Sequence, residues 1–381
     1  MTPPFPENGP DASPTFDGHP LRLLKHSTPP DVLERHIAKL GNELASGSPP
    51  SEGFSWPPPA GSELERILQA DELTKWDYDL FKLNELTNGR PLAAIAQGVI
   101  RSHGLVEKCG IDEQVLGRYL NAVESTYNAC VYHNPMHAAD VMHGTNFLLS
   151  GELAQNMPPD ELLIGLISGP AHDLGHPGVN NGYLNKRSHP VAETYKNVSV
   201  LENHHVNLSL SLMDLPGMDV LGCFDDKRKG ELKDMMRSVV LFTDMTKHKE
   251  MMELLQAVAD EKRVLSTGRA DDRVLIFQTV LHTADLGNPC KPWAIHIQWT
   301  HAIVAEFFSQ GDLERGQGAE LSPMCDRHEN CGRTSQKNFV KFFVRPLFVL
   351  CGEVMPETLA KCTSCVTQLD SNVERWTELG F

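Results

Sequence analysis

Apolar residues recur at intervals of three and four along most of the chain, which is the spacing of one face of an α-helix. One such stripe contains Leu162, Leu163, Leu166 and Ile167, and the segment 273–285 carries another. No convincing run of alternating β-branched residues competes with these stripes. The hydrophobic pattern therefore predicts an all-α fold.

Two segments rich in proline and glycine precede the helical region and are expected to be linker, residues 1–29 and residues 48–61. Between them, four apolar residues fall at helical spacing: Leu33, Ile37, Leu40 and Leu44. They predict a short amphipathic helix, which either docks on the domain or a partner chain, or stays marginal in a disordered tail. The predicted organisation is an N-terminal segment over residues 1–61 and one domain over residues 62–381.

Composition narrows the classes of function. The chain has 50 acidic and 34 basic residues and a formal net charge of −16, so its average surface repels nucleic acid and anionic membranes. It has no apolar run of the roughly 18 residues that a membrane span needs, and no secretory signal. Its nine scattered cysteines are typical of a reduced, cytoplasmic protein. An anionic substrate would need a local centre of positive charge.

Candidate chemistry is concentrated in four clusters of histidine and acidic residues, "YHNPMHAADVMH", "AHDLGHPG", "LENHH" and "LHTADLGNP". In the first cluster, Asn134 can cap a helix whose first residue is Pro135, because both residue types favour those positions. His133 would then lie at the mouth of that helix and His137 one turn inside it. Taken alone, the pattern around His137 favours a structural role over that of a metal ligand.

In the second cluster, His172 and His176 are four residues apart and Asp173 follows His172 directly. Residues four apart lie on one side of a helical turn, and we expect Pro177 and Gly178 to end the helix there. These side chains would therefore lie at an open helix end, where solvent and a ligand can reach them.

The fourth cluster places Asp285 one turn after Leu281, on an apolar stripe. A buried carboxylate costs several kcal/mol unless a cation or a hydrogen-bond donor compensates for it. Together with His137, His172 and Asp173, it supplies two imidazole nitrogens and two carboxylate oxygens. That set suits zinc or a comparable divalent ion.

Seven ordered motifs resemble the class I cyclic-nucleotide phosphodiesterases: "YHNPMHAADV", "HDLGHPGVNN", "SVLENHH", "LFTDMTKH", "HTADLGNP", "QWTHAIVAEFFSQGD" and "SPMCDRH". The resemblance extends from Leu73 to Trp376. It implies a compact catalytic domain of about sixteen helices. It also implies zinc at the four residues named above, and a second ion, magnesium or manganese, bridged by Asp173. Three residues would hold water around the second ion: His176, Glu202 and Thr243.

The same resemblance implies hydrolysis of the 3' phosphoester bond of cAMP or cGMP to the 5'-monophosphate by a metal-bridging hydroxide. His133 would be the general acid, and Gln336 would bind the purine edge. Phe339 and Ile303 would clamp the base. The remaining expected pocket residues are Tyr132, Met245, Asn288, Trp299, Phe307 and Met324.

The sequence departs from the family pattern at two positions. Gly175 stands where many members carry an acidic residue, and His296 stands where some cAMP-selective members carry tyrosine. Asn288 occurs in several members that hydrolyse cAMP, which favours that substrate.

Other classes of function stay open at this point. A nucleotidase or triphosphohydrolase is one alternative, although the Tyr132–His133 pair and Gln336 argue against it. A catalytically weak nucleotide-binding module is another. A homodimer, or upstream regulatory domains in a larger protein of which this is the cytosolic part, also stays open.

Overall fold

The computed structural model describes residues 15–16, 19–20, 53–328 and 336–379. This part of the chain contains seventeen α-helices, which confirms the prediction of an all-α fold of about sixteen helices. Its strands are two residues each and pair antiparallel, β1 (Thr15–Phe16) with β2 (His19–Pro20). The amphipathic helix predicted over residues 33–44 lies outside the described residues.

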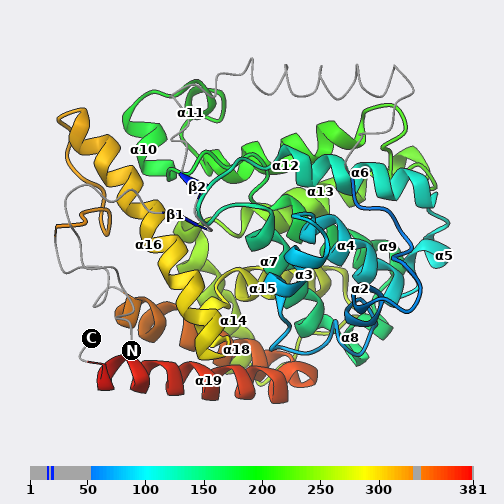
Figure 1. Ribbon diagram of the computed structural model, residues 1–381. Helices are drawn as coiled ribbons and strands as arrows, with labels where there is room; N and C mark the ends of the chain where they lie inside the picture. Colours follow the sequence, from blue (N-terminus) through cyan, green and yellow to red (C-terminus); the bar gives the residue numbers. More distant parts are fainter. Residues whose placement is uncertain (1–14, 17–18, 21–52, 329–335, 380–381) are drawn as a thin grey trace.

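Figure 1 shows the helices in their order along the chain. The first nine are α2 (Glu63–Ile67), α3 (Leu80–Leu86), α4 (Pro91–Ser102), α5 (Leu105–Cys109), α6 (Glu113–Thr126), α7 (Pro135–Leu149), α8 (Glu152–Asn156), α9 (Pro159–Ala171) and α10 (Asn181–Lys186). The next six are α11 (Pro190–Thr194), α12 (Val200–Met213), α13 (Asp226–Leu241), α14 (His248–Asp260), α15 (Ala270–Asp285) and α16 (Trp293–Gly316). The last two are α18 (Arg345–Val354) and α19 (Leu359–Glu378). Short 3-10 turns are η1 (Met245–Lys247), η2 (Asn288–Cys290) and η4 (Pro356–Thr358), and η3 (Val340–Val344) is a π-helical turn.

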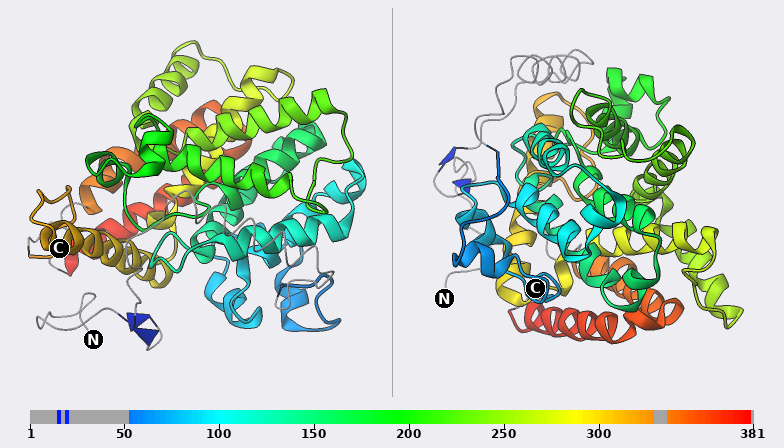
Figure 2. Two further views of the ribbon diagram at one scale, coloured as in Figure 1. Left: turned by 90° about the horizontal axis from the view of Figure 1, so that it is seen from above. Right: turned by 90° about the vertical axis from the view of Figure 1, so that its right-hand side faces the viewer.

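Helix α7 lies at the centre of the fold and packs against α4, α9 and α15 (Figure 1). Nearly every residue of α7 is buried, as are most residues of α9 and of the second half of α15. Helix α19 runs along the lower edge of the molecule in Figure 1 and in the right-hand view of Figure 2, and packs on α18. The central helices therefore hold their polar residues inside the protein.

The start of α7 is fixed by its own sequence. Asn134 is the N-cap and its side chain accepts hydrogen bonds from the backbone N–H groups of Met136 and His137 at 2.9 and 3.3 Å. Pro135 is the first helical residue, where its missing N–H costs nothing. The predicted cap is confirmed, and it places His137 in the first turn.

A glycine allows α9 and α15 to approach closely. A Cβ atom at Gly165 would lie 2.3 Å from the ring of Phe277, which is buried in the core. The ring fills the space that a side chain on α9 would otherwise occupy. This contact brings the C-terminal ends of the two helices together, so that His172 at the end of α9 lies near Asp285 at the end of α15.

The 61/62 domain boundary stays a prediction. Within the segment expected to be linker, Phe54 exchanges two backbone hydrogen bonds with the side chain of Asn121, at 2.7 and 2.9 Å. Trp56 lies under the guanidinium of Arg101 at 4.8 Å. The part of the chain that the structure describes has no helix that is both long and apolar enough to cross a membrane.

We predict that Gly165→Ala destabilises the protein by about 1–3 kcal/mol, because the added methyl group has to displace the Phe277 ring. Gly230→Ala in α13 is the matched control, since a Cβ atom there meets nothing within 4 Å. The control should be neutral or gain up to about 1 kcal/mol from reduced backbone entropy. Urea unfolding measures both, and equal stability of the two variants would contradict the close packing.

Candidate metal centre and the adjoining pocket

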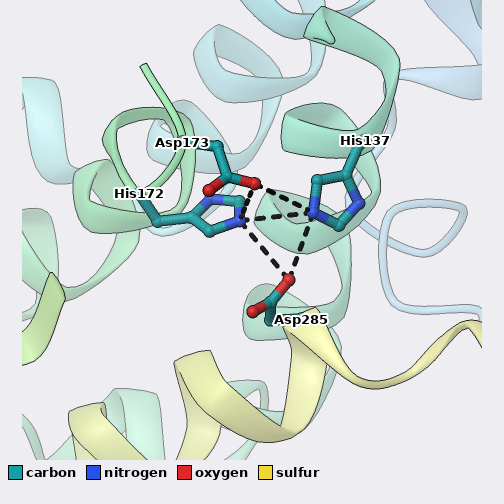
Figure 3. Close-up of side chains that lie close together, drawn as sticks. All are labelled: His137, His172, Asp173 and Asp285. Atoms are coloured by element: carbon teal, nitrogen blue, oxygen red, sulfur yellow. Dashed lines mark hydrogen bonds and ion pairs between the residues drawn. The ribbon is translucent and has the colours of Figure 1, made fainter. Parts of the chain in front are cut away.

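Four side chains from three helices point toward one another in the middle of the fold (Figure 3). His137 comes from the first turn of α7, and Asp285 is the last residue of α15. His172 is the C-cap of α9, and Asp173 follows it. Their ligand atoms all lie within 4.8 Å of one another. The structure thus brings together the four residues that the sequence assigned to one metal site.

The spacing of these atoms fits a single small cation. The two Nε2 atoms of His137 and His172 are 3.3 Å apart. Four distances from these nitrogens to Asp173 Oδ2 and Asp285 Oδ1 range from 3.1 to 3.5 Å. Atoms about 2.0–2.1 Å from a tetrahedral ion are about 3.4 Å apart, so the set needs little adjustment to bind one.

The chemistry of the donors supports the same conclusion. His172 Nδ1 donates to the carbonyl oxygen of Gly169 at 2.7 Å, which leaves Nε2 with a lone pair facing the cluster. Burial alone would lower the pKa of His172, but Asp173 raises it well above its usual value. Burial also favours a protonated Asp173, yet His172 lowers the pKa of this carboxyl well below its usual range. A proton or a metal ion is needed to hold the two carboxylates together.

A second group of candidate ligands shares Asp173. Atoms of His133, Asp173 and His176 also lie within 4.8 Å of one another. The rings of His133 and His176 stack with centroids 3.9 Å apart. Burial, together with His133, lowers the pKa of His176 to about 3, so this imidazole is neutral near pH 7. Asp173 is therefore the carboxylate that two neighbouring cations could share.

His205 adds an unsatisfied nitrogen beside this carboxylate. Its Nδ1 donates to the carbonyl oxygen of Leu174 at 2.7 Å, so Nε2 carries a lone pair. This Nε2 is buried, has no hydrogen-bond partner among the described residues and lies 3.7 Å from Asp173 Oδ1. Two acceptors facing each other without a donor or a cation are unfavourable. The arrangement fits a cation, or water held by one, next to Asp173.

His133 is held by a buried glutamate. Its Nδ1 forms a short hydrogen bond to Glu306 Oε1, while Glu306 Oε2 accepts the backbone N–H groups of Tyr132 and His133 at 2.8 and 3.2 Å. Burial alone would lower the pKa of His133, but Glu306 and Asp173 raise it to about 9. The imidazole is thereby kept protonated. Its Nε2 lies 4.0 Å from Asp173 Oδ2.

The turn after α9 depends on Gly175. This residue has a φ of 74°, in the left-handed region, and a Cβ atom there would lie 2.8 Å from Leu208 Cδ2. The helix ends at Ala171, so the prediction that Pro177 and Gly178 end it was wrong. The tight turn, rather than a continued helix, directs His176 toward His133.

A pocket of about 720 Å³ opens onto these groups. His137 and His172 are buried behind it, with 0% and 1% of their surface exposed. All the other residues expected in the site line it: Tyr132, His133, Asp173, His176, Glu202, Thr243, Met245, Asp285, Asn288, Trp299, Ile303, Phe307, Met324, Gln336 and Phe339. The volume lies within the range of small-molecule sites.

Glu202 lies on the wall near the second group of ligands. Asn181 Nδ2 donates to its two carboxylate oxygens at 3.0 and 3.2 Å. Burial and the nearby Asp244 raise the pKa of Glu202 to about 7. Thr243 lines the same pocket, and its hydroxyl donates to the carbonyl oxygen of Val240 at 2.8 Å. These groups can orient water around a cation.

His296 also lines the pocket and is hydrogen-bonded to the last helix. The indole N–H of Trp376 in α19 donates to His296 Nε2 at 2.9 Å, and the Thr300 hydroxyl lies 3.4 Å from Nδ1. Burial lowers the pKa of His296 to about 4. The neutral imidazole that this bond requires is therefore the form present near pH 7.

Three residues of the site were missed by sequence reasoning, Glu306, His205 and Asn181. His205 was present in the "LENHH" cluster, but nothing distinguished it from His204. Glu306 lies within the motif "QWTHAIVAEFFSQGD" on the buried face of α16. An acidic residue on the buried face of a helix was the signal that could have identified it. Their partners are too distant in the sequence to be recognised from spacing.

We predict that His296→Gln weakens the acid sensitivity of the fold. The folded-state pKa is about 4 and the unfolded value is 6.5, so wild type loses stability as the pH falls from 6.5 to 4. The loss from this residue is about 2 kcal/mol at pH 5. The side-chain oxygen of glutamine can accept the hydrogen bond from the Trp376 indole, and glutamine does not titrate in this pH range.

Urea unfolding at pH 7 and pH 5 measures the difference. Wild type should lose more stability than the variant between these pH values by about that amount. Parallel losses in the two proteins would contradict the assigned burial of a neutral imidazole.

An all-α domain with a His/Asp cluster at the floor of an open pocket defines a candidate metal-dependent hydrolase. Comparison with known proteins gives the family. The family model of 3'5'-cyclic nucleotide phosphodiesterase matches residues 132–366. The chain belongs to this family.

Several relatives are similar over most of the chain. The 3',5'-cyclic-AMP phosphodiesterase 4C of Rattus norvegicus is 37% identical over 293 residues, which cover 75% of this chain and 55% of the relative. The 3',5'-cyclic-AMP phosphodiesterase, isoform F, of Drosophila melanogaster is 33% identical over 297 residues, covering 76% and 45%. The chain spans about half the length of these curated relatives.

Among solved structures, the phosphodiesterase domain of Salpingoeca rosetta rhodopsin phosphodiesterase has the same fold. The two superpose with a TM-score of 0.75 at 27% sequence identity, over 84% of this chain and 95% of that chain.

Proposed function

We propose that this protein hydrolyses the 3' phosphoester bond of 3',5'-cyclic nucleotides, cAMP foremost, to nucleoside 5'-monophosphates. The observation that carries the proposal is the convergence of His137, His172, Asp173 and Asp285 below a pocket whose rim holds His133. Family membership supports the reaction class. The names of the similar relatives support cAMP as the substrate.

In this proposal His137, His172, Asp173 and Asp285 hold zinc. Asp173 would also help to hold a magnesium or manganese ion, and His176, Glu202 and Thr243 would orient water around it. Two such ions supply positive charge for the phosphate and lower the pKa of bound water. This local charge solves the problem set by the net charge of −16, which would otherwise repel an anionic substrate.

His133 acts as the general acid. The leaving 3' oxygen is an alkoxide and needs a proton, which a positioned imidazolium can donate from Nε2. Glu306 supports this role because it accepts hydrogen bonds from His133 Nδ1 and from the backbone N–H groups of Tyr132 and His133, and because it raises the pKa of His133. Cations bound nearby would lower that pKa toward neutrality and make the proton easier to transfer.

The purine would lie at the apolar end of the pocket. Phe339 and Ile303 offer flat and aliphatic surfaces for the base, and Gln336 offers one acceptor and two donors for its edge. Phe339 is half-buried and its ring stacks on Phe343 with centroids 5.6 Å apart. This stack supports the proposed clamp, because it limits the positions that the Phe339 ring can take.

Cytoplasmic location, a homodimer and upstream regulatory domains remain predictions from the sequence. None of them is needed for the reaction proposed here, since every proposed site residue belongs to this chain.

Steady-state hydrolysis of cAMP and cGMP with magnesium or manganese tests the proposal. His133→Asn should lower kcat by about 100- to 10,000-fold and change KM little, because the acid acts in the transition state. His103→Asn is the control, since His103 caps α4 and bonds to Asn146 away from the pocket. Wild type that turns over neither nucleotide, or prefers nucleoside triphosphates, would overturn the proposed reaction.

Metal binding can be tested without activity. In protein stripped by a chelator, zinc at 100 times its Kd should raise the free energy of unfolding by about 2.7 kcal/mol. Asp285→Asn should lose this gain. Asp272→Asn, on the same helix and bonded to Arg263 at 2.7 and 2.8 Å, should keep it despite a lower starting stability. An equal gain in all three proteins would rule out the assigned site.

A further inference from the structure

A buried carboxylate outside the candidate metal centre accepts three hydrogen bonds. Glu314, in the last turn of α16, is 2% exposed. It accepts the backbone N–H and the hydroxyl of Ser322, both at 2.6 Å, and the side-chain NH₂ group of Gln310 at 3.0 Å. Burial alone would raise the pKa of Glu314, but the bonds from Ser322 lower it below its usual value. The group is therefore an ionised acceptor near pH 7, and the proposed reaction gives it no role.

Gln310 carries this contact to the turn before α10. Its Oε1 accepts the backbone N–H of Asn180 at 2.9 Å, and Asn180 is the N-cap of α10. The next residue, Asn181, donates from Nδ2 to the two carboxylate oxygens of Glu202 at 3.0 and 3.2 Å. A continuous chain of contacts therefore runs from Glu314 to the carboxylate of Glu202, which is proposed to orient water around the second ion.

The charge of Glu314 decides which way the Gln310 amide points. An amide has nearly the same shape in both orientations, whereas an ionised carboxylate can only accept hydrogen bonds. Glu314 therefore requires the NH₂ group of Gln310 on its side, and the amide oxygen has to face the N–H of Asn180. If the amide were reversed, two donors would face each other at this turn, which costs free energy.

The same carboxylate holds the chain segment that returns over α16 and carries Met324. Met324 lines the pocket with a φ of 68°, in the left-handed region that a methionine rarely adopts. A Cβ atom at Gly311 would lie 1.8 Å from the carbonyl oxygen of Cys325, so the segment lies directly on the backbone of α16. This contact and the bonds to Ser322 hold the segment independently of the amide chain. The two roles of the carboxylate can therefore be separated by experiment.

We infer that Glu314 and Gln310 are positioning residues for the second divalent ion. They hold the turn at residues 180–181, and that turn holds the carboxylate of Glu202. The inference rests on the proposed function. Neither side chain has to contact the ion, because groups that only orient the surroundings of a metal site also set its affinity.

Glu314→Gln reverses the amide while keeping the shape of the side chain. The new amide can give its oxygen to the N–H of Ser322 and its NH₂ group to position 310. Gln310 then has to turn its own oxygen toward position 314, which places its NH₂ group against the N–H of Asn180. The turn loses its hydrogen bond, whereas the segment that carries Met324 keeps its own.

Exchanging the two residues restores the chain. In Glu314→Gln combined with Gln310→Glu, the carboxylate at position 310 accepts from the N–H of Asn180 and from the NH₂ group at position 314. The total charge is that of wild type. Arg315→Gln is the matched control, because it removes an exposed ion pair with Asp326 at 2.6 Å from the same segment and leaves the amide chain intact.

The measurements use protein with zinc bound at the first site. The electron paramagnetic resonance signal of free Mn²⁺ gives the Kd of the second site, and NMR on protein with isotope-labelled asparagine gives the exchange rate of the Asn180 amide. Glu314→Gln should raise both by about tenfold, the effect of one hydrogen bond. The double variant should recover both wild-type values, and Arg315→Gln should change neither.

KM for the cyclic nucleotide at saturating Mn²⁺ should stay within about twofold in every variant, because the Met324 segment is kept. A merely structural role predicts a lower thermal midpoint with an unchanged Kd for Mn²⁺. That result, an equal rise of Kd in Arg315→Gln, or a double variant that does not recover the affinity would overturn this inference alone. Wild type that binds Mn²⁺ but hydrolyses neither cyclic nucleotide would overturn the proposed function, and wild type that binds no Mn²⁺ would overturn both.

Discussion

The structure depends on bringing two partly buried carboxylates and two buried imidazoles together where α7, α9 and α15 meet. Each of these groups costs free energy when it leaves water, and the two carboxylates repel each other at this distance. His137 and His172 offset part of that cost, and a divalent cation would offset most of it. The close contact at Gly165 and the cap at Asn134 matter because they bring these side chains to one point.

The surrounding polar groups extend the same principle outward. Two buried carboxylates near the pocket have partners of opposite sign and further donors: Glu306 has His133 and two backbone N–H groups, and Asp140 has Lys291 and Asn288. Fully satisfied networks of this kind restrict side chains to one orientation. The metal centre would supply charge for the phosphate, while these networks set the direction of the groups that meet the rest of the ligand.

Much of the site could be predicted from the sequence because its signals are local. Asn134 and Pro135 mark a helix start, and His172, Asp173 and His176 lie within five residues. The end of α9 was misplaced, because the left-handed turn at Gly175 breaks the segment before Pro177 does. Glu306 and Lys291 could not be assigned, since their partners are 173 and 151 residues away and only the folded chain brings them together.

The most direct test of this account is anomalous diffraction from crystals grown with zinc, collected on both sides of the zinc absorption edge. The account predicts one strong peak bonded to Nε2 of both His137 and His172 and to oxygens of Asp173 and Asp285, and its loss in Asp285→Asn. A peak elsewhere, or none at these four residues in wild type, would contradict it.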